Sequence, residues 1–343
     1  MNATTYAVDT AKNVMQLHWV DLQTGEIKRR KLSRAKFLEF FAQRQPARVV
    51  MEACGGAHHW GRALSALGWQ AELLPAGQVR AFVRSNKDDA ADARAIWLVA
   101  QHGDMRRVPI KSVEQQAVLS LHRLRAHWIS VRTASINALR GLLYEFGVVL
   151  PKGKGAGLKA LAERRAELQA QLPATMMRLL DLQLHALDDV HGSVMALDAE
   201  IAEVARANAA VQRLDRIAGV GVLGATALAA SLGDGHGWKS GRVFAASLGL
   251  APCHSGTGGK VRIGGASKRG DSYLRYLLIN GARSIVQLAH PPQWVAELLE
   301  RRPFNVVVVA LAHKMARQAW ALVAHEREFD PKWVSVAPIR QPA

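Results

Sequence analysis

Cysteine is almost missing from this 343-residue sequence, which contains only Cys54 and Cys253. There is no CxxC pair and no His/Cys spacing typical of zinc ligands, so a zinc-binding fold or a disulfide framework is not expected. The N-terminus has no signal-peptide pattern, and no apolar run approaches the ~20 residues that a membrane-spanning helix needs. The longest run, residues 305–312, is expected to be buried. We expect a protein of a reducing bacterial cytoplasm that has no membrane partner.

Acidic residues are also scarce, with 28 Asp and Glu against 45 Lys and Arg, which gives a net charge of +17. Such an excess favours a polyanionic partner over a small-molecule substrate. Basic residues cluster at 28–31, 260–269 and 301–302, and there is no lysine-rich tail, so the charge is expected on folded surfaces. The length and the 49% hydrophobic content are enough for two or three domains with cores.

Strand and helix signals alternate over residues 1–108. Two or three strands come first, with the hairpin turn "DLQTGE", followed by a helix over 34–43 and a strand over 47–54. A helix over 59–68, the strand "QAELL" and a helix over 88–103 complete this part. The pattern predicts an α/β domain with a mixed sheet.

Residues 109–210 contain no strand signals. Apolar residues recur there in two heptad rows, which predict long helices and a coiled-coil seam within the chain or between subunits. The rows are Ala117, Leu121, Leu124, Trp128, Val131, Ser135, Ala138, Leu142 and, after a break at 147–157, Leu187, Val190, Val194, Leu197, Ile201, Val204. Residues 211–330 predict a third, mostly helical domain, and 331–343 form a Pro-containing tail.

Four acids in the first part of the chain stand where a ligand site is expected. Asp9 lies inside an apolar strand, Glu52 lies near the end of another, and Asp89 and Asp92 share one face of a helix. Ligands of open α/β sheets bind at the carboxyl ends of the strands, where these acids could converge. Carboxylates alone suit Mg²⁺ or Mn²⁺, and two such ions stabilise phosphodiester displacement. The alternatives are a turn or cap role for Asp9 and helix-dipole charges for the Asp pair.

Two glycine-rich motifs follow. "GVGVLG" (219–224) lacks the strand context of a dinucleotide site and favours a helix-hairpin-helix element. In that element Gly219 and Gly221 either expose backbone N–H groups to a phosphate or simply allow a tight turn.

The second motif, "PCHSGTGGKVRIGGASKRGD" (252–271), fails as a nucleotide P-loop because Val261 follows the lysine. We expect it to be a phosphate-binding loop that uses Gly258, Gly259, Lys260, Arg262, Lys268 and Arg269. Spacing alone does not identify Ser255 as a nucleophile, because serine needs a base or a metal for activation, and the adjacent His254 is the candidate base.

Five segments together resemble the DEDD transposases of bridge-RNA-guided insertion sequences, to which Piv-type DNA invertases are related. They are "YAVDTAK", "VVMEACG", "NKDDAADARAI", "IAGVGVLGATALAASLGD" and "FAASLGLAPCHSGTGGKVRIGGASKRGDSYLRYLLINGA". The resemblance implies a RuvC-like (RNase H fold) domain joined through a coiled coil to a helical transposase domain. It implies a metal-binding tetrad of Asp9, Glu52, Asp89 and Asp92, and Ser255 as the nucleophile of a covalent phosphoserine intermediate. It also implies a structured guide RNA that pairs with donor and target DNA.

One departure concerns the nucleophile. Relatives commonly read Ser-Thr-Gly-Gly-Lys or Ser-Ser-Gly-Gly-Lys, whereas this chain reads Ser-Gly-Thr-Gly-Gly-Lys, so Thr257 aligns by its distance to the lysine. We favour Ser255 because a secondary hydroxyl is more hindered. Arg275 is expected to stabilise transition-state charge and Ser267 to support the loop.

Recombination of two duplexes needs four strand cuts, so we expect a homo-oligomer between dimer and tetramer. The serine of one subunit can then meet the metal ions of another. Three other readings stay open: a metal-dependent junction or RNA nuclease that uses water, a DNA invertase without guide RNA, and a non-catalytic nucleic-acid-binding protein.

Overall fold

A computed structural model describes residues 4–83, 89–103, 105–258 and 260–331. The chain divides into two compact units, Met1–Gln115 and Gln116–Ala343. The boundary predicted after residue 108 lies near this division, whereas the one predicted after 210 has no counterpart in it. The three-domain division therefore stays a prediction, and most of the predicted tail lies outside the described residues.

The first unit contains the predicted mixed sheet, in the order β3-β2-β1-β4-β5. Its strands are β1 (Thr5–Thr10), β2 (Val14–Val20), β3 (Ile27–Ser33), β4 (Arg48–Glu52) and β5 (Gln70–Leu74). β1, β2 and β3 pair antiparallel, while β4 lies parallel to both β1 and β5. The prediction of a mixed α/β domain is confirmed, and the sheet is consistent with a DEDD or RuvC-like domain.

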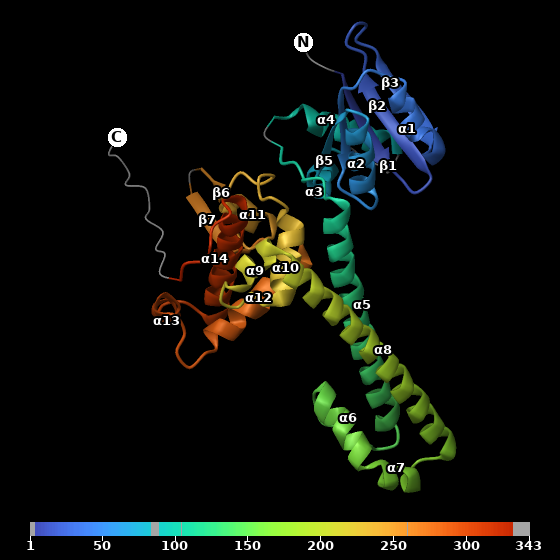
Figure 1. The fold of residues 1–343 in the computed structure, drawn as a ribbon, viewed down its shortest axis with the longest axis vertical. Coiled ribbons are helices and arrows are strands. Elements are labelled where there is room, and N and C mark those ends of the chain that lie inside the picture. The colour runs from blue at the N-terminus through green and yellow to red at the C-terminus, as the bar shows by residue number, and fades with distance from the viewer. Residues whose placement is uncertain (1–3, 84–88, 104, 259, 332–343) are drawn as a thin grey trace. The chain divides into compact units, whose positions relative to one another are not determined.

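Helices cover both faces of this sheet (Figure 1). Because side chains alternate along a strand, Val8 and Met51 face one side while Ala7 and Val50 face the other. The first side is packed by α1 (Arg34–Ala42) and α2 (Ala57–Ala66), and the second by α3 (Ala76–Val79), the 3₁₀ turn η1 (Arg80–Phe82) and α4 (Asp89–Gln101). We call the second side the α4 face.

Long helices open the second unit (Figure 1). They are α5 (Val113–Tyr144), which starts just before the division, and α8 (Ala174–Ala207), with α6 (Lys154–Glu163) and α7 (Arg165–Gln171) between them. Arg125 pairs with Asp198, and the Gln183 amide donates to the Ser135 carbonyl at 3.5 Å. These two contacts show that α5 and α8 run antiparallel.

The predicted heptad row is correct in α8, where Leu187, Val190, Val194 and Ile201 are buried. It is wrong in α5, where Leu124 and Leu142 are 46% and 45% exposed. The helix instead buries Ile136, Leu139 and Leu143. The physical reason is side-chain size: the predicted row contains Ala117, Ser135 and Ala138, and the row that is buried removes more apolar area from water.

The rest of the second unit is mostly helical. Its elements are α9 (Ala209–Asp215), α10 (Val222–Leu232), α11 (Gly241–Ser247), β6 (Pro252–Thr257), β7 (Lys260–Ala266), α12 (Ser272–Val286), α13 (Gln293–Leu299) and α14 (Phe304–Ala324). By length and composition α14 could cross a membrane, but half of its apolar window is buried inside the unit. Val307, Val308 and Leu311, within the predicted apolar run, belong to this core.

The prediction of a loop at 252–271 is wrong. Pro252–Thr257 and Lys260–Ala266 pair antiparallel as the two strands of a β-hairpin, β6 and β7 (Figure 1). The sequence signal was the alternation of Lys260, Val261, Arg262 and Ile263, which is typical of a strand but is hard to recognise among so many glycines.

Candidate active site

Two of the four acids lie side by side at the carboxyl ends of parallel strands. Val8 of β1 is opposite Met51 of β4, so the residues that follow, Asp9 and Glu52, are neighbours across the pair. Both point to the α4 face, because they lie two residues beyond Ala7 and Val50, which α4 buries. Each is half-buried. The strand-end position expected from the sequence is therefore where the structure places these two acids.

Helix α4 brings Asp92 to Glu52. Burial raises the pKa of Glu52, and the negative charge of Asp92 raises it further. A cation bound beside Glu52 would favour its ionised form against both effects. Asp89 begins α4 three residues before Asp92, so its backbone is in the first turn, while its side chain lies outside the described residues.

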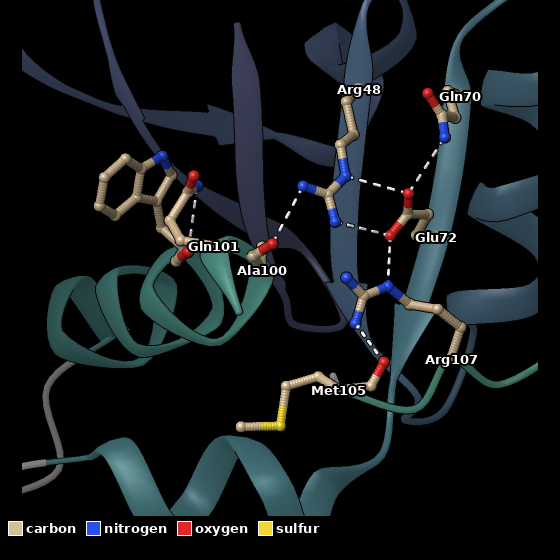
Figure 2. A network of polar contacts seen from close by, with 8 residues as sticks. Arg48, Gln70, Glu72, Ala100, Gln101, Met105 and Arg107 are labelled. Atoms are coloured by element: carbon tan, nitrogen blue, oxygen red, sulfur yellow. Dashed lines mark hydrogen bonds and ion pairs between the residues drawn. The ribbon is translucent and has the colours of Figure 1, made fainter. Parts of the chain in front are cut away.

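A half-buried ion-pair network fixes the opposite end of α4 (Figure 2). Arg48 holds both carboxylate oxygens of Glu72, at 3.0 and 2.9 Å, and donates to the Ala100 carbonyl near the helix end at 3.0 Å. Arg107 also pairs with Glu72. Because the end of α4 is tied to the start of β4, its first turn must lie toward the end of β4, where Glu52 is.

Burial disfavours the charged form of Glu72, but the hydrogen bonds from Arg48 and Arg107 outweigh it and hold the pKa of Glu72 below its ordinary value. The network is therefore ionised at neutral pH. The network contacts α4 at the end away from the acids, so we interpret it as a support that positions those acids.

The donor chemistry of this site fits a hard divalent cation, since every candidate ligand is a carboxylate oxygen. Within the described residues, however, no three His, Cys, Asp or Glu side chains are gathered closely enough to form a complete metal site. Glu52 and Asp92 are coupled and Asp9 adjoins Glu52 by register, while the side chain of Asp89 is not described.

The second unit has a candidate site of its own, the β6–β7 hairpin. Ser255 is opposite Arg262 and Thr257 is opposite Lys260, so strand alternation puts all four on one face, which we call the hydroxyl face. His254 and Ile263 form a pair on the reverse face. All of these residues are exposed and line a shallow open depression at the hairpin tip or adjoin it.

His254 is therefore badly placed to serve as the base for Ser255, because adjacent strand residues point to opposite faces. Within the described part of the chain the Ser255 hydroxyl makes no hydrogen bond at all.

The base of the hairpin is rigidly closed. The Ser267 amide donates to the Ala251 carbonyl at 2.9 Å, and Gly270, with φ 86°, lies so close to the Ser247 carbonyl that a Cβ would meet it at 1.7 Å. Lys268 also has a positive φ, 55°. Arg275 donates to the Leu248 carbonyl at 2.8 Å from beneath. The guanidinium of Arg275 thus braces the hairpin base.

The other predicted phosphate contacts are divided. Gly258, with φ 56°, is at the hairpin tip, Arg269 is exposed at its base, and Gly259 lies outside the described residues. Gly219, with φ 84°, packs against Gly281 of α12, whose carbonyl a Cβ would meet at 2.7 Å. Gly221 is exposed at the start of α10. Gly219 is therefore needed for packing, and only Gly221 is open to a ligand.

Sequence reasoning missed which residues of β2 and β3 lie in line with the acids. Asp9 is opposite Gln16, and Gln16 is opposite Lys31, so the three form one row across the sheet. Only the strand register reveals this row, and nothing in the local sequence encodes that register.

Two family models match the chain. Residues 211–298 match the transposase IS116/IS110/IS902 family, and residues 7–147 match the DEDD transposase model of the IS110 type, which is described as a transposase. The first match includes the hairpin, and the second includes the four acids. A DEDD transposase domain generally implies the use of a divalent metal ion.

Full-length relatives carry the same description. A probable family 20 transposase of Pseudomonas aeruginosa is 44% identical over 337 residues, which is 96% of this chain and all of the relative. The transposase for insertion sequence element IS1111A of Coxiella burnetii is 37% identical over 94% of this chain and 90% of the relative. The transposase for element IS1328 of Yersinia enterocolitica is 36% identical, over 96% and 99%.

Proposed function

The chain belongs to the IS116/IS110/IS902 family of transposases, and we propose that it is the RNA-guided transposase of a bacterial insertion sequence, with Ser255 as the nucleophile that cuts DNA. Membership of the family means that the protein acts on DNA and cleaves and rejoins its strands. The serine chemistry, the identity of the metal ion, the guide RNA and the assembly are the proposal. The cytoplasmic location of the protein is part of the same proposal.

The observation that carries the proposal is the hydroxyl face of the hairpin. Ser255 shares this exposed face with Arg262 and Lys260, so a phosphate that reaches the hydroxyl also meets two cations. Among the described residues no base lies beside the Ser255 hydroxyl. This arrangement agrees with a nucleophile that is activated by a separate acidic site. Lys268 and Arg269 extend the cationic surface, Gly258 lies at the hairpin tip, and Arg275 supports the hairpin base.

The acids supply the second half. Asp9, Glu52, Asp89 and Asp92 would hold Mg²⁺ or Mn²⁺, which neutralises charge on the scissile phosphate and lowers the pKa of a bound hydroxyl. The raised pKa of Glu52 beside Asp92 supports this assignment, because a cation between the two carboxylates removes their repulsion.

The reaction is a pair of transesterifications. Ser255 Oγ forms a bond to phosphorus, one sugar oxygen leaves as a hydroxyl, and the serine proton replaces the lost bond on that oxygen. A hydroxyl of the partner DNA strand then attacks the phosphoserine and releases the serine. Each step exchanges one phosphoester bond for another, so no nucleotide triphosphate is needed, in agreement with the absence of a P-loop motif.

The partners follow from charge and from the resemblance. Donor DNA, target DNA and a structured guide RNA are the polyanions that a net charge of +17 favours. Gly221, at the exposed start of α10, offers backbone N–H groups to a phosphate. A homotetramer at synapsis supplies four serines for four strand cuts.

A denaturing gel tests the nucleophile. The full-length protein is incubated with its guide RNA and end-labelled element DNA in Mg²⁺, and a protein–DNA adduct is sought. We expect the adduct in the wild type and in Thr257→Val, and its complete loss in Ser255→Ala. An adduct that persists in Ser255→Ala and disappears in Thr257→Val would transfer the role to Thr257.

The same assay separates the other functions. Cleavage without any adduct, retained in Ser255→Ala, would indicate a nuclease that uses water. Strand exchange that does not depend on the RNA would indicate an invertase-like enzyme.

A further inference from the structure

The edge strand β3 carries four consecutive basic residues, Lys28, Arg29, Arg30 and Lys31, which the proposed function does not use. Strand alternation divides them between the two faces of the sheet. Lys28 and Arg30 lie on the side of α1, since Leu32 two residues later is in the core on that side. Arg29 and Lys31 lie on the α4 face, opposite His18 and Gln16.

The two pairs are used differently. On the α1 side, Lys28 Nζ pairs with Asp21 at 3.6 Å and Glu26 at 3.5 Å, and the Arg30 guanidinium stacks over Phe40 at 5.2 Å from the ring centroid. On the α4 face, Arg29 and Lys31 are exposed and form no ion pair within the described part of the chain. The α1-side pair has intramolecular partners, whereas the pair on the α4 face shares that face with the acids.

The surroundings of His18 confirm where Arg29 points. His18 is 2% exposed and packs beside Trp97 of α4, with ring centroids 5.9 Å apart. Burial, followed by the charges of Arg29 and Arg94, lowers the pKa of His18 to about 4. His18 is therefore neutral at physiological pH, and the positive charge on this side of the sheet comes from the two arginines and Lys31.

The strand register links this charge to the acids. Lys31, Gln16 and Asp9 are successive members of one row, and Glu52 follows Asp9 on β4. With ~4.8 Å between neighbouring strands, Lys31 is roughly 10 Å from Asp9 along the row. For a duplex whose axis runs along this row, that distance spans about three nucleotide steps at the ~3.4 Å axial rise of each strand.

We propose that Arg29 and Lys31 bind the phosphodiester backbone of the DNA strand being cut, about three nucleotides from the phosphate at the acids. The inference rests on the proposed function, because it places the scissile phosphate at those acids. DNA is the partner because the cations share the α4 face with the acids. Charges on an edge strand also discourage sheet-to-sheet pairing, a role that Lys28 and Arg30 on the other face would fulfil equally well.

The salt dependence of DNA binding tests this contact. In a full-length Ser255→Ala background, Arg29→Gln/Lys31→Gln is compared with Lys28→Gln/Arg30→Gln, which removes the same charge from the other face of the same strand. Binding to a duplex that contains an element end is measured over a range of salt concentrations. For the first pair, the slope of log K against log salt should fall by about 1.8, or 0.9 for each phosphate lost. The second pair should leave the slope unchanged.

A positional measurement supplies the location. One phosphate at a time along the cut strand is replaced by a neutral methylphosphonate. The contacted phosphate is the one whose replacement weakens binding by the Ser255→Ala protein but not by its Arg29→Gln/Lys31→Gln derivative. We expect it about three nucleotides from the cut site. Equal effects of the two double variants, or a defect confined to guide-RNA binding, would overturn the inference.

Cleavage by the wild-type protein is measured on the same duplex with its guide RNA and Mg²⁺. If it cuts and the two double variants behave alike, only this inference fails. If it never cuts but the slope falls as expected, the backbone contact stands and the proposed function fails.

Discussion

At the scale of single residues, Glu52 shows a conflict between stability and function. Its folded-state pKa is raised, first by burial and then by Asp92, so its ionised form is destabilising without a cation. This destabilisation is absent below the pKa of Glu52 in the unfolded chain, and it grows as the pH rises through the pKa of Glu52 in the folded protein. We expect Glu52→Gln to melt at a higher temperature than the wild type in EDTA at pH 7.5, and to lose at least ~100-fold in DNA cleavage.

Thermal unfolding with EDTA and with Mg²⁺ checks this. The wild type should gain stability from Mg²⁺, and Glu52→Gln should gain much less. A variant that melts below the wild type in EDTA would show that Glu52 has a structural partner.

His122 is a second informative residue, buried where α5, α10 and α12 meet, and 1% exposed. The Thr226 hydroxyl donates to the Val222 carbonyl at 2.7 Å, so it accepts from His122 Nε2 at 2.9 Å. His122 Nδ1 then accepts from the Tyr273 hydroxyl at 3.0 Å. The neutral Nε2–H tautomer satisfies every partner, and it ties the start of α12, just after the hairpin, to α5.

Burial, with a smaller effect from Arg125, lowers the pKa of His122 to about 4. The unfolded chain therefore binds a proton at higher pH, and stability falls as the pH drops from about 6.5 to about 4. The loss should reach ~2 kcal/mol at pH 5. His122→Gln offers one donor and one acceptor without titrating, so its urea unfolding free energy should depend less on pH. His18 leaves a remaining slope in both proteins, and equal slopes would contradict the assignment.

At the scale of elements, Glu72 holds Arg48, and Arg48 ties the end of α4 to the start of β4 (Figure 2). The first turn of α4 therefore faces Glu52. Glu72→Gln leaves two guanidinium groups without their carboxylate and should cost ~2–3 kcal/mol at pH 7. Because the folded pKa of Glu72 is lowered, this stability is present above the unfolded pKa and is lost as the pH falls through the folded one.

The unfolding free energies of Glu72→Gln and the wild type should therefore converge as the pH falls below the folded-state pKa of Glu72. Gln70→Ala, which removes a single amide hydrogen bond to Glu72, is the control and should cost no more than ~1 kcal/mol. Cleavage by Glu72→Gln should fall although every acid is intact, and unchanged cleavage would mean that α4 is placed by packing alone.

Elements also show what the sequence could predict. Alternating patterns were enough for the mixed sheet, the long helices and the strand-end positions of Asp9 and Glu52, because period and punctuation are local. The α5 seam was missed because two adjacent rows of one helix are both apolar, and only packing selects Ile136, Leu139 and Leu143. The row of Asp9, Gln16 and Lys31 was missed because register is a property of paired strands.

At the scale of the whole molecule, the acids belong to the first unit and Ser255 to the second. Each half lacks something that the other has: the acids have no nucleophile, and the hairpin has no base among its described residues. The family resemblance implies that the two halves can come from different subunits of an oligomer. A catalytic centre assembled in this way would keep a lone monomer from cutting DNA.

Mixing two inactive proteins tests this arrangement. Asp9→Asn lacks an acid and Ser255→Ala lacks the nucleophile, so neither should cut element DNA alone. If a serine from one subunit meets the acids of another, mixed oligomers contain intact centres built from the wild-type halves. We expect about a quarter of centres to be active at equal mixing, since each centre draws its acids and its serine at random with probability one half.

A double variant, Asp9→Asn/Ser255→Ala, mixed with the wild type is the control for subunit exchange. Robust exchange without any recovered cleavage would place both halves of each centre in the same chain.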